Sequence, residues 1–336
     1  MPKVELHVHL EGAMMPDTVW MLAERNGVHL PVGSAEEWRA HCKFRDFNHF
    51  IELYNLAAST VRTPEDFALI VERFCAEQAR QNIRHSEAIL SVSMHIHQLP
   101  GEAMADALAE GVRRGQAAHG VSLYLLPDIS RHLPGTARAV LDFALMAHKR
   151  HPGVFVGLQL GGKEEGFPAE LFADVYAAAR REGLRVLAHA GETAGPESVR
   201  AAVEILHVER IGHGIRCLED SALVDVLRDR QIPLEVCPTS NVCLKVVSSL
   251  TAHPLPKMLD AGLNVTINSD DPPMFNTTLT DEWLACAVTY GWDLAMVEKL
   301  SLNAVRATFL PATEKSASEM RFKSEWKRIL QEQLEA

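Results

Sequence analysis

The sequence has few of the features that mark secreted, membrane or nucleic-acid-binding proteins. Its six cysteines are scattered without a Cys-x-x-Cys pair, which favours reduced thiols over a disulfide framework. No apolar run reaches the ~18 residues of a membrane span, and no charged-then-apolar leader precedes the first predicted strand. A net charge of −11 would repel a phosphate backbone. These absences predict a soluble cytoplasmic protein that binds neither nucleic acid nor membrane.

The composition is that of a globular protein with a large core. Apolar residues make up 47% of the 336-residue chain, a length that suits one large α/β barrel or two ordinary domains. No internal repeat and no low-complexity linker divides the chain. We therefore predict a single domain over residues 1–336.

Short apolar runs rich in β-branched residues alternate with longer helical patterns. The eight predicted strands are 4–9, 83–91, 121–128, 154–160, 185–190, 210–213, 232–237 and 263–269. This alternation predicts parallel strands with right-handed crossovers, and eight such units indicate an α/β fold of the closed (β/α)8, or TIM, barrel type. An open doubly wound sheet is the alternative, but no Gly-x-Gly-x-x-Gly signature follows the first strand.

Two stretches lie outside these strand–helix units. Residues 10–82 show helical patterns and include the aromatic residues Phe44, Phe47, Phe50 and Tyr54. We expect extra helices there that wall one side of the barrel mouth, although the aromatic residues could equally be core packing. The segment Glu314–Glu335 predicts terminal helices with a solvated, mixed-charge face.

The first predicted strand carries two histidines, His7 and His9. Residues two apart in a strand point to the same face, so both imidazoles should aim at one point. A bound metal ion needs that arrangement of neutral nitrogen ligands. The alternative is two polar residues that merely share one strand face.

The ends of later predicted strands supply further polar groups. They carry His189, Glu192, His213, Asp270 and Asp271. Reactive side chains of a barrel gather at the carboxyl ends of its strands. A metal accounts for the set, because His7, His9, His189 and Asp270 could bind it and leave a place for water. Imidazole and carboxylate ligands suit zinc, with iron or another divalent ion possible.

Three of these residues are candidates for catalysis. Glu192 is suited to general acid–base work, although a carboxylate near a helix N-terminus can simply be stabilised by the helix dipole. His213, flanked by glycines, could orient or deprotonate an attacking water. Asp271 could bind substrate or water, or could only support the turn before Pro272.

Five motifs occur in order along the chain. They are His-Val-His-Leu-Glu-Gly at 7–12, His-Ala-Gly-Glu at 189–192, Gly-His-Gly at 212–214, Pro-Thr-Ser-Asn at 238–241 and Ser-Asp-Asp-Pro at 269–272. Each motif is weak alone, but the ordered set resembles the adenosine deaminase family of the amidohydrolase superfamily.

The resemblance implies a reaction and a role for each motif. One zinc ion, held by His7, His9, His189 and Asp270, would activate water to attack the amine-bearing carbon of a 6-aminopurine. By the family pattern Glu192 protonates the neighbouring ring nitrogen, while His213 and Asp271 handle the water. Asp271 and the backbone of Gly162 would also contact the purine. An inosine-type product and ammonia would leave.

The choice of substrate is less certain from the sequence. Glu11 stands where adenosine-specific members of the family carry Asp, near the sugar, and residues 159–164 also depart from their pattern. We expect a purine nucleoside, either 6-aminodeoxyfutalosine of menaquinone biosynthesis or adenosine. A cation such as Lys163, Arg45 or Arg62 could meet the benzoate group of the former.

Three alternatives to a nucleoside deaminase remain open. The first is an adenine deaminase that acts on the free base. The second is another amidohydrolase that cleaves an amide or ester, and the third is a barrel without catalytic activity.

Overall fold

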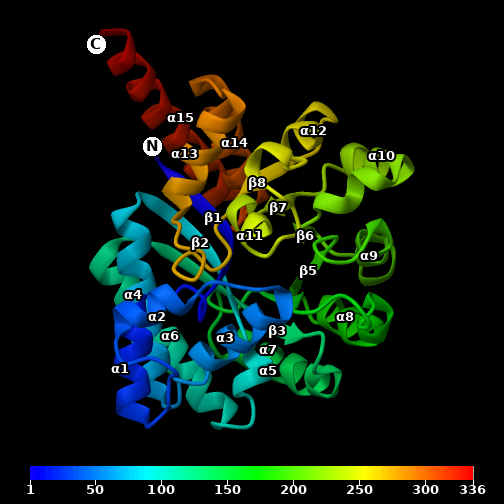
Figure 1. Ribbon diagram of the computed structural model, residues 1–336. Coiled ribbons are helices and arrows are strands. Elements are labelled where there is room, and N and C mark those ends of the chain that lie inside the picture. Colours follow the sequence, from blue (N-terminus) through cyan, green and yellow to red (C-terminus); the bar gives the residue numbers. More distant parts are fainter. Residues whose placement is uncertain (336) are drawn as a thin grey trace.

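The computed structural model describes the backbone of residues 1–335 and the side chains of residues 1–332. Eight parallel strands, each paired with the next along the chain, form its centre (Figure 1). They are β1 (Lys3–His9), β2 (Ile83–Leu90), β3 (Ser122–Ser130), β4 (Gly157–Gly161), β5 (Arg185–Ala190), β6 (Arg210–His213), β7 (Leu234–Val236) and β8 (Val265–Ile267). The predicted TIM-type barrel is confirmed.

The barrel closes through a short seam between β1 and the end of β8. No ladder joins these two strands, but Val8 and Asp270 form a parallel bridge. The His9 N–H donates to the Asp270 carbonyl at 2.9 Å, and the Asp270 N–H donates to the His7 carbonyl at 3.1 Å. The backbone that closes the barrel therefore belongs to residues expected to bind metal.

Four helices lie between β1 and β2, as the sequence predicted. They are α1 (Pro16–Asn26), α2 (Ala35–His41), α3 (Phe47–Ala58) and α4 (Pro64–Arg80), drawn in blue to cyan in Figure 1. A capping box between Thr63 and Asp66 starts α4. Phe50 and Tyr54 of α3 are buried, so the aromatic residues of this region contribute to the core as well as to the wall of the barrel mouth.

The remaining helices form the outer layer, and all of the helical stretches predicted between later strands are present. They are α5 (Val92–His95), α6 (Gly101–His119), α7 (Ala137–Arg150), α8 (Ala173–Arg181), α9 (Pro196–Ala201), α10 (Ser221–Arg230), α11 (Pro238–Cys243), α12 (Leu255–Asp260) and α13 (Leu279–Tyr290). Short 3-10 or π segments are η1 (Pro134–Thr136), η2 (Ala169–Phe172), η3 (Ala202–Leu206), η4 (Ile215–Glu219) and η5 (Leu250–Ala252).

The last two helices, α14 (Leu294–Ala307) and α15 (Ala312–Glu335), pack beside the first strand. Val4 and Leu6, which point outward from β1, share an apolar cluster with Leu302 and Phe322. The predicted solvated face of α15 is therefore only part of the helix, because Phe322 and Trp326 are buried. Among residues 1–335, no helix combines the length and apolar character needed to cross a membrane.

Candidate active site

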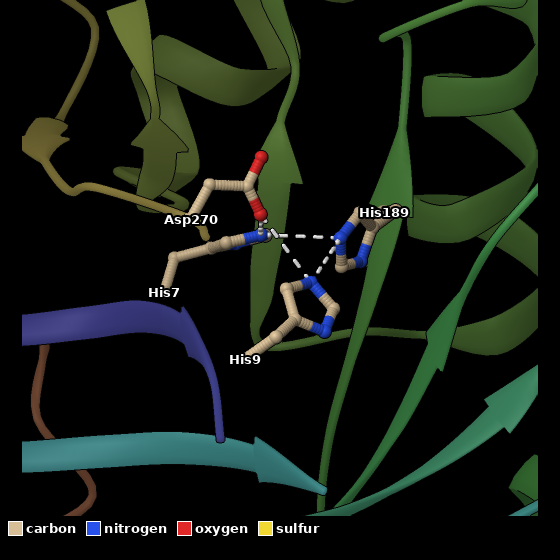
Figure 2. Close-up of side chains that lie close together, drawn as sticks. All are labelled: His7, His9, His189 and Asp270. Carbon is tan, nitrogen blue, oxygen red and sulfur yellow. Dashed lines mark hydrogen bonds and ion pairs between the residues drawn. The ribbon is translucent and has the colours of Figure 1, made fainter. Parts of the chain in front are cut away.

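Four side chains converge at the carboxyl end of the barrel (Figure 2). His7 and His9 come from β1, His189 from β5 and Asp270 from the residues after β8. The Nε2 atom of His189 lies 3.1 Å from that of His7 and 3.3 Å from that of His9. Asp270 Oδ1 lies 3.4 Å from His7 Nε2 and 3.3 Å from His9 Nε2. The strand geometry inferred from the sequence therefore brings all four predicted ligands together.

The spacing of these four atoms fits a metal ion. A regular tetrahedron with edges of this length has its centre about 2.0 Å from each corner, which matches zinc–nitrogen bonds. Two Nε2 atoms that face each other at 3.1 Å cannot both carry a proton. A shared cation would satisfy their lone pairs and the carboxylate together, so the residues present fit a metal centre.

Three further side chains orient the ligands. Glu235 accepts from His7 Nδ1 at 3.0 Å, and the Ser240 hydroxyl donates to Asp270 Oδ2 at 2.6 Å. Burial opposes protonation of His7, but the carboxylates of Asp270 and Glu235 outweigh it and raise its pKa to about 9. The Gln159 amide lies 2.5 Å from His189 Nδ1. Since metal binding through Nε2 leaves a proton on Nδ1, the amide oxygen of Gln159 should face this ring.

Glu192 and His213 lie beside the metal ligands. Both are buried, with 3.7 Å between His213 Nε2 and Glu192 Oε2. Burial, and then the carboxylates of Asp270 and Glu164, raise the pKa of Glu192 well above its usual value. Burial lowers the pKa of His213 to about 3. A carboxyl group whose pKa is raised, beside an imidazole whose pKa is lowered, is suited to proton transfer.

Asp271 is a buried carboxylate without a partner for one of its oxygens. Its Oδ1 atom accepts no hydrogen bond from the described residues. Burial, and then the neighbouring Asp270, raise the pKa of Asp271 well above its usual value. Because a buried polar atom without a partner is costly, this oxygen is available to a ligand or a water molecule.

A partly enclosed cavity opens onto these groups. Its polar floor includes His9, His189, Glu192, His213, Asp270 and Asp271. Its apolar wall comes mainly from α3 and consists of Phe47, Phe50, Ile51, Tyr54, Met94 and Leu244. Gly162 also lines it, in the left-handed region at φ +79°, where a Cβ would lie 3.0 Å from the His132 ring. The cavity has room for a small, flat molecule between an apolar wall and a polar floor.

Glu11 lies behind the cavity wall and does not line the cavity. Its Oε1 accepts from the Ser91 N–H at 3.0 Å and lies 3.1 Å from His95 Nε2, while its Oε2 accepts from the Tyr54 hydroxyl at 3.3 Å. Its position does not support the expected contact with a sugar, because its oxygens already have protein partners.

The basic residues expected at the mouth do not line the cavity either. Neither Lys163 nor Arg45 nor Arg62 is among its lining residues. The Arg62 side chain donates instead to the carbonyl of Ser59 at 3.2 Å. None of the residues that line the cavity is a lysine or an arginine.

Asp128, at the end of β3, is a site residue that the sequence analysis missed. It is buried, it lines the cavity, and its Oδ1 has no hydrogen-bond partner among the described residues. Burial raises its pKa to about 7. The sequence does contain a signal for Asp128. The predicted third strand ends at this residue, and a polar residue at a strand end is the feature that identifies the other site residues.

The arrangement can be compared with known proteins. The adenosine deaminase family profile matches residues 2–321. The chain belongs to the adenosine deaminase family. It is a metal-dependent aminohydrolase of that family, with a His-His-His-Asp metal site.

Several relatives in the adenosine deaminase family have a stated activity. Adenine deaminase from Cupriavidus necator is 39% identical over 317 residues, which cover 94% of this chain and 89% of the relative. The enzyme of the same name from Rhodospirillum rubrum is 39% identical over 318 residues, 94% of each chain. The relatives favour adenine over the nucleosides expected from the sequence, and they give no support to a role in menaquinone biosynthesis.

Solved structures agree with the fold and with the metal site. The crystal structure of adenine deaminase from Arthrobacter aurescens is 35% identical, with a TM-score of 0.91 over 97% of this chain and 99% of that one. An amidohydrolase from Burkholderia ambifaria with bound zinc is 26% identical, with a TM-score of 0.91 over 100% of this chain and 93% of that one.

Proposed function

We propose that this protein hydrolyses the exocyclic amine of free adenine, releasing ammonia and the 6-oxo purine. Metal-dependent deamination of a purine follows from membership of the adenosine deaminase family. The choice of the free base over a nucleoside is the additional inference that we make here. The observation that carries it is the buried, unpartnered Oδ1 of Asp128 in the cavity. The named adenine deaminases at 35–39% identity support the same choice.

The chemistry of the purine explains why Asp128 matters. A free purine carries an N–H on its imidazole ring, and a nucleoside carries a sugar there instead. A buried carboxylate oxygen without a donor is suited to accept that N–H, because leaving it unpaired costs about 1–3 kcal/mol. A nucleoside would bring its sugar toward the apolar wall formed by Phe47, Phe50 and Tyr54. The Glu11 oxygens, expected from the sequence to lie near a sugar, are bound instead by Tyr54, Ser91 and His95.

We further propose that His7, His9, His189 and Asp270 hold one divalent metal ion, and that this ion is zinc. A relative with bound zinc supports that choice, as does the imidazole-rich donor set. When bound, the ion would lower the pKa of a water molecule toward neutrality.

The other residues would then handle protons and orientation. Glu192, kept protonated by its surroundings, would donate to the ring nitrogen beside the reacting carbon. That donation favours attack because it reduces the aromatic character of the ring. His213, neutral at physiological pH, would orient the water or accept its proton, and the free oxygen of Asp271 would accept a hydrogen bond from water or purine. The backbone of Gly162 would contact the opposite side of the ring.

Ammonia release from a substrate panel tests the proposal. The zinc-loaded enzyme would be given adenine, adenosine, methylthioadenosine and 6-aminodeoxyfutalosine. We expect kcat/KM to be highest for adenine, and a preference for any nucleoside would overturn the proposed substrate. No ammonia from any purine would reject purine deamination as well.

A variant sharpens the same experiment. Asp128→Ala should lower kcat/KM for adenine about 10- to 100-fold, the size of a lost hydrogen bond to a charged group. The matched control is Asp142→Ala, on the exposed face of α7, which should behave like the wild type. An unchanged kcat/KM in Asp128→Ala would remove this residue from recognition.

A further inference from the structure

The loop after β5, which carries Glu192, is bound by a single carboxylate from another part of the chain. Glu164, in the connection between β4 and α8, is buried. Its oxygens accept from four consecutive backbone N–H groups and from one hydroxyl: Gly191 at 2.9 Å, Glu192 at 2.8 Å, Thr193 at 2.9 Å, Ala194 at 3.4 Å and Ser198 Oγ at 2.5 Å. Four successive N–H groups that converge on one anion form a backbone nest.

The N–H groups of this loop find their acceptor outside regular secondary structure. Residues 191–195 belong to neither a strand nor a helix, so their N–H groups have no ladder partners. Buried N–H groups need an acceptor, and the Glu164 carboxylate supplies it. The loop is also closely packed, since Gly191 has φ +67° and a Cβ there would lie 2.4 Å from Val199 Cγ2. Its N–H groups therefore depend on the Glu164 carboxylate, while its carbonyls are held by Arg216, which donates from its backbone to Gly191 at 3.1 Å and from its side chain to Thr193 at 3.2 Å.

A buried arginine stabilises the same region from the other side. Arg131, which follows β3, donates to the carbonyl of His189 at 2.5 Å and to that of Phe167 at 3.0 Å. Glu164 is the foremost of the negative groups that favour its charged form. The end of β5 and the loop after it are thus bound by a buried cation and a buried anion that interact with each other.

From this geometry we propose that Glu164 is a positioning residue for Glu192. It would hold the loop so that the Glu192 side chain enters the cavity in the orientation needed for proton donation. This inference rests on the proposed role of Glu192 as the proton donor. Glu164 does not line the cavity of the site, so it would act through the loop and not by touching substrate.

The variant Glu164→Gln tests the inference by kinetics. Glutamine keeps the shape but replaces one of the two accepting oxygens with an N–H₂ group, which opposes the loop N–H donors. We expect kcat to fall about 10- to 100-fold, as for a small misplacement of a catalytic group, with KM within about twofold and metal content unchanged. The matched control is Glu165→Gln, the exposed neighbour on the same loop, which should match the wild type. An unchanged kcat, or a loss that follows loss of metal, would overturn the inference.

Hydrogen exchange gives a readout that needs no substrate. In the metal-loaded protein, the amides of residues 191–194 should exchange at least about tenfold faster in Glu164→Gln than in the wild type, because their acceptor is weakened. The variant Ser198→Ala, which removes one of the five donors and leaves the carboxylate, should change them little. Equal protection in Glu164→Gln and the wild type would refute the inference. Should the wild type deaminate no purine, the proposed function fails while this measurement still judges whether Glu164 holds the loop.

Discussion

Gly12 and Asp271 are in such close contact that no side chain fits between them. A Cβ built on Gly12 would lie 1.6 Å from Asp271 Oδ1 and 2.5 Å from its Cγ. Gly12 follows β1, and Asp271 follows β8, so the contact crosses the seam that closes the barrel. The glycine is required by this close approach, and it leaves Asp271 free to face the cavity.

Replacing this glycine should displace Asp271. In Gly12→Ala the new methyl group would overlap the Asp271 carboxylate, which must move away. We expect kcat/KM to fall by about 100-fold or more, with metal content retained. Steady-state kinetics and metal analysis measure both. The control Gly135→Ala adds a methyl group where no atom lies within 4 Å, and it should leave activity unchanged. Normal activity in Gly12→Ala would show that the position of Asp271 is unimportant.

The pH profile should show the protonation state of Glu192. Its pKa is raised above the usual value, so the carboxyl group is protonated below that raised pKa and loses its proton as the pH increases through it. Because the proposed role is proton donation, kcat should be constant below that pKa and should decrease tenfold per pH unit above it. Rates that increase with pH through this region would contradict the assignment.

Removal of the Glu192 carboxyl group should separate catalysis from metal binding. In Glu192→Gln we expect kcat to fall by about 10²- to 10⁴-fold, the usual contribution of a general acid, with one metal ion still bound. The exposed Glu170→Gln serves as the control for loss of one acidic group. Near-normal rates in Glu192→Gln would exclude this side chain as the proton donor.

Metal affinity should depend on Glu235, which accepts the Nδ1 proton of His7. In Glu235→Gln the ligand is less firmly oriented and less basic, so the affinity for zinc should fall about 10- to 100-fold. Competition with a chromophoric chelator measures the affinity, and Glu209→Gln, which is only partly buried, is the control.

Complete removal of the metal ion from the wild type by a chelator should abolish deamination, and added zinc should restore it. Deamination that survives chelation would rule out a required metal.

Stability should depend on a buried ion pair inside the barrel. Arg210 Nη1 lies 2.7 Å from Glu87 Oε2, and both side chains are buried. Burial opposes ionisation of Glu87, but Arg210 outweighs it and lowers the pKa to about 2. A folded-state pKa below the unfolded value stabilises the protein above about pH 4.3, and that contribution is lost as the pH falls toward 2.

Breaking this pair should be costly at neutral pH. Glu87→Gln leaves the buried Arg210 with fewer counter-charges, so we expect the free energy of unfolding to fall by about 3–5 kcal/mol. Urea unfolding at constant metal content measures it. The exposed pair Arg138–Asp142 provides the comparison, since Asp142→Asn should cost less than about 1 kcal/mol. An equal decrease in the free energy of unfolding in the two variants would show that burial does not increase the contribution of the ion pair to stability.

The sequence predicted the barrel because the positions of strands and helices depend on residues that are close together in the chain. Apolar runs with β-branched residues set the strands, and their alternation with helical patterns set parallel pairing. His7 and His9 were predictable as partners because the two-residue period of a strand is a property of the backbone. His189 and Asp270 could be added because all carboxyl ends of a parallel barrel meet at one rim.

Other site features depend on contacts that no local pattern contains. Glu11 has the sequence position of a substrate contact, yet its oxygens are bound by Tyr54 of α3, by His95 of α5 and by Ser91 between β2 and α5. The cationic residues near the expected mouth do not line the cavity, since their direction depends on how the helices after β1 and the connection after β4 pack. The choice between a nucleoside and a free base depends on this packing.

The chain by itself therefore determined the order of the strands, the four metal ligands and the identity of the candidate acid Glu192. Only the tertiary structure decided which carboxylates remain free, Asp128 and Asp271, and which are taken up by protein donors, Glu11 and Glu164. The physical reason is that strand periodicity and strand ends are set by neighbouring residues. A hydrogen bond between side chains far apart in sequence exists only after the helices and loops have packed around the barrel.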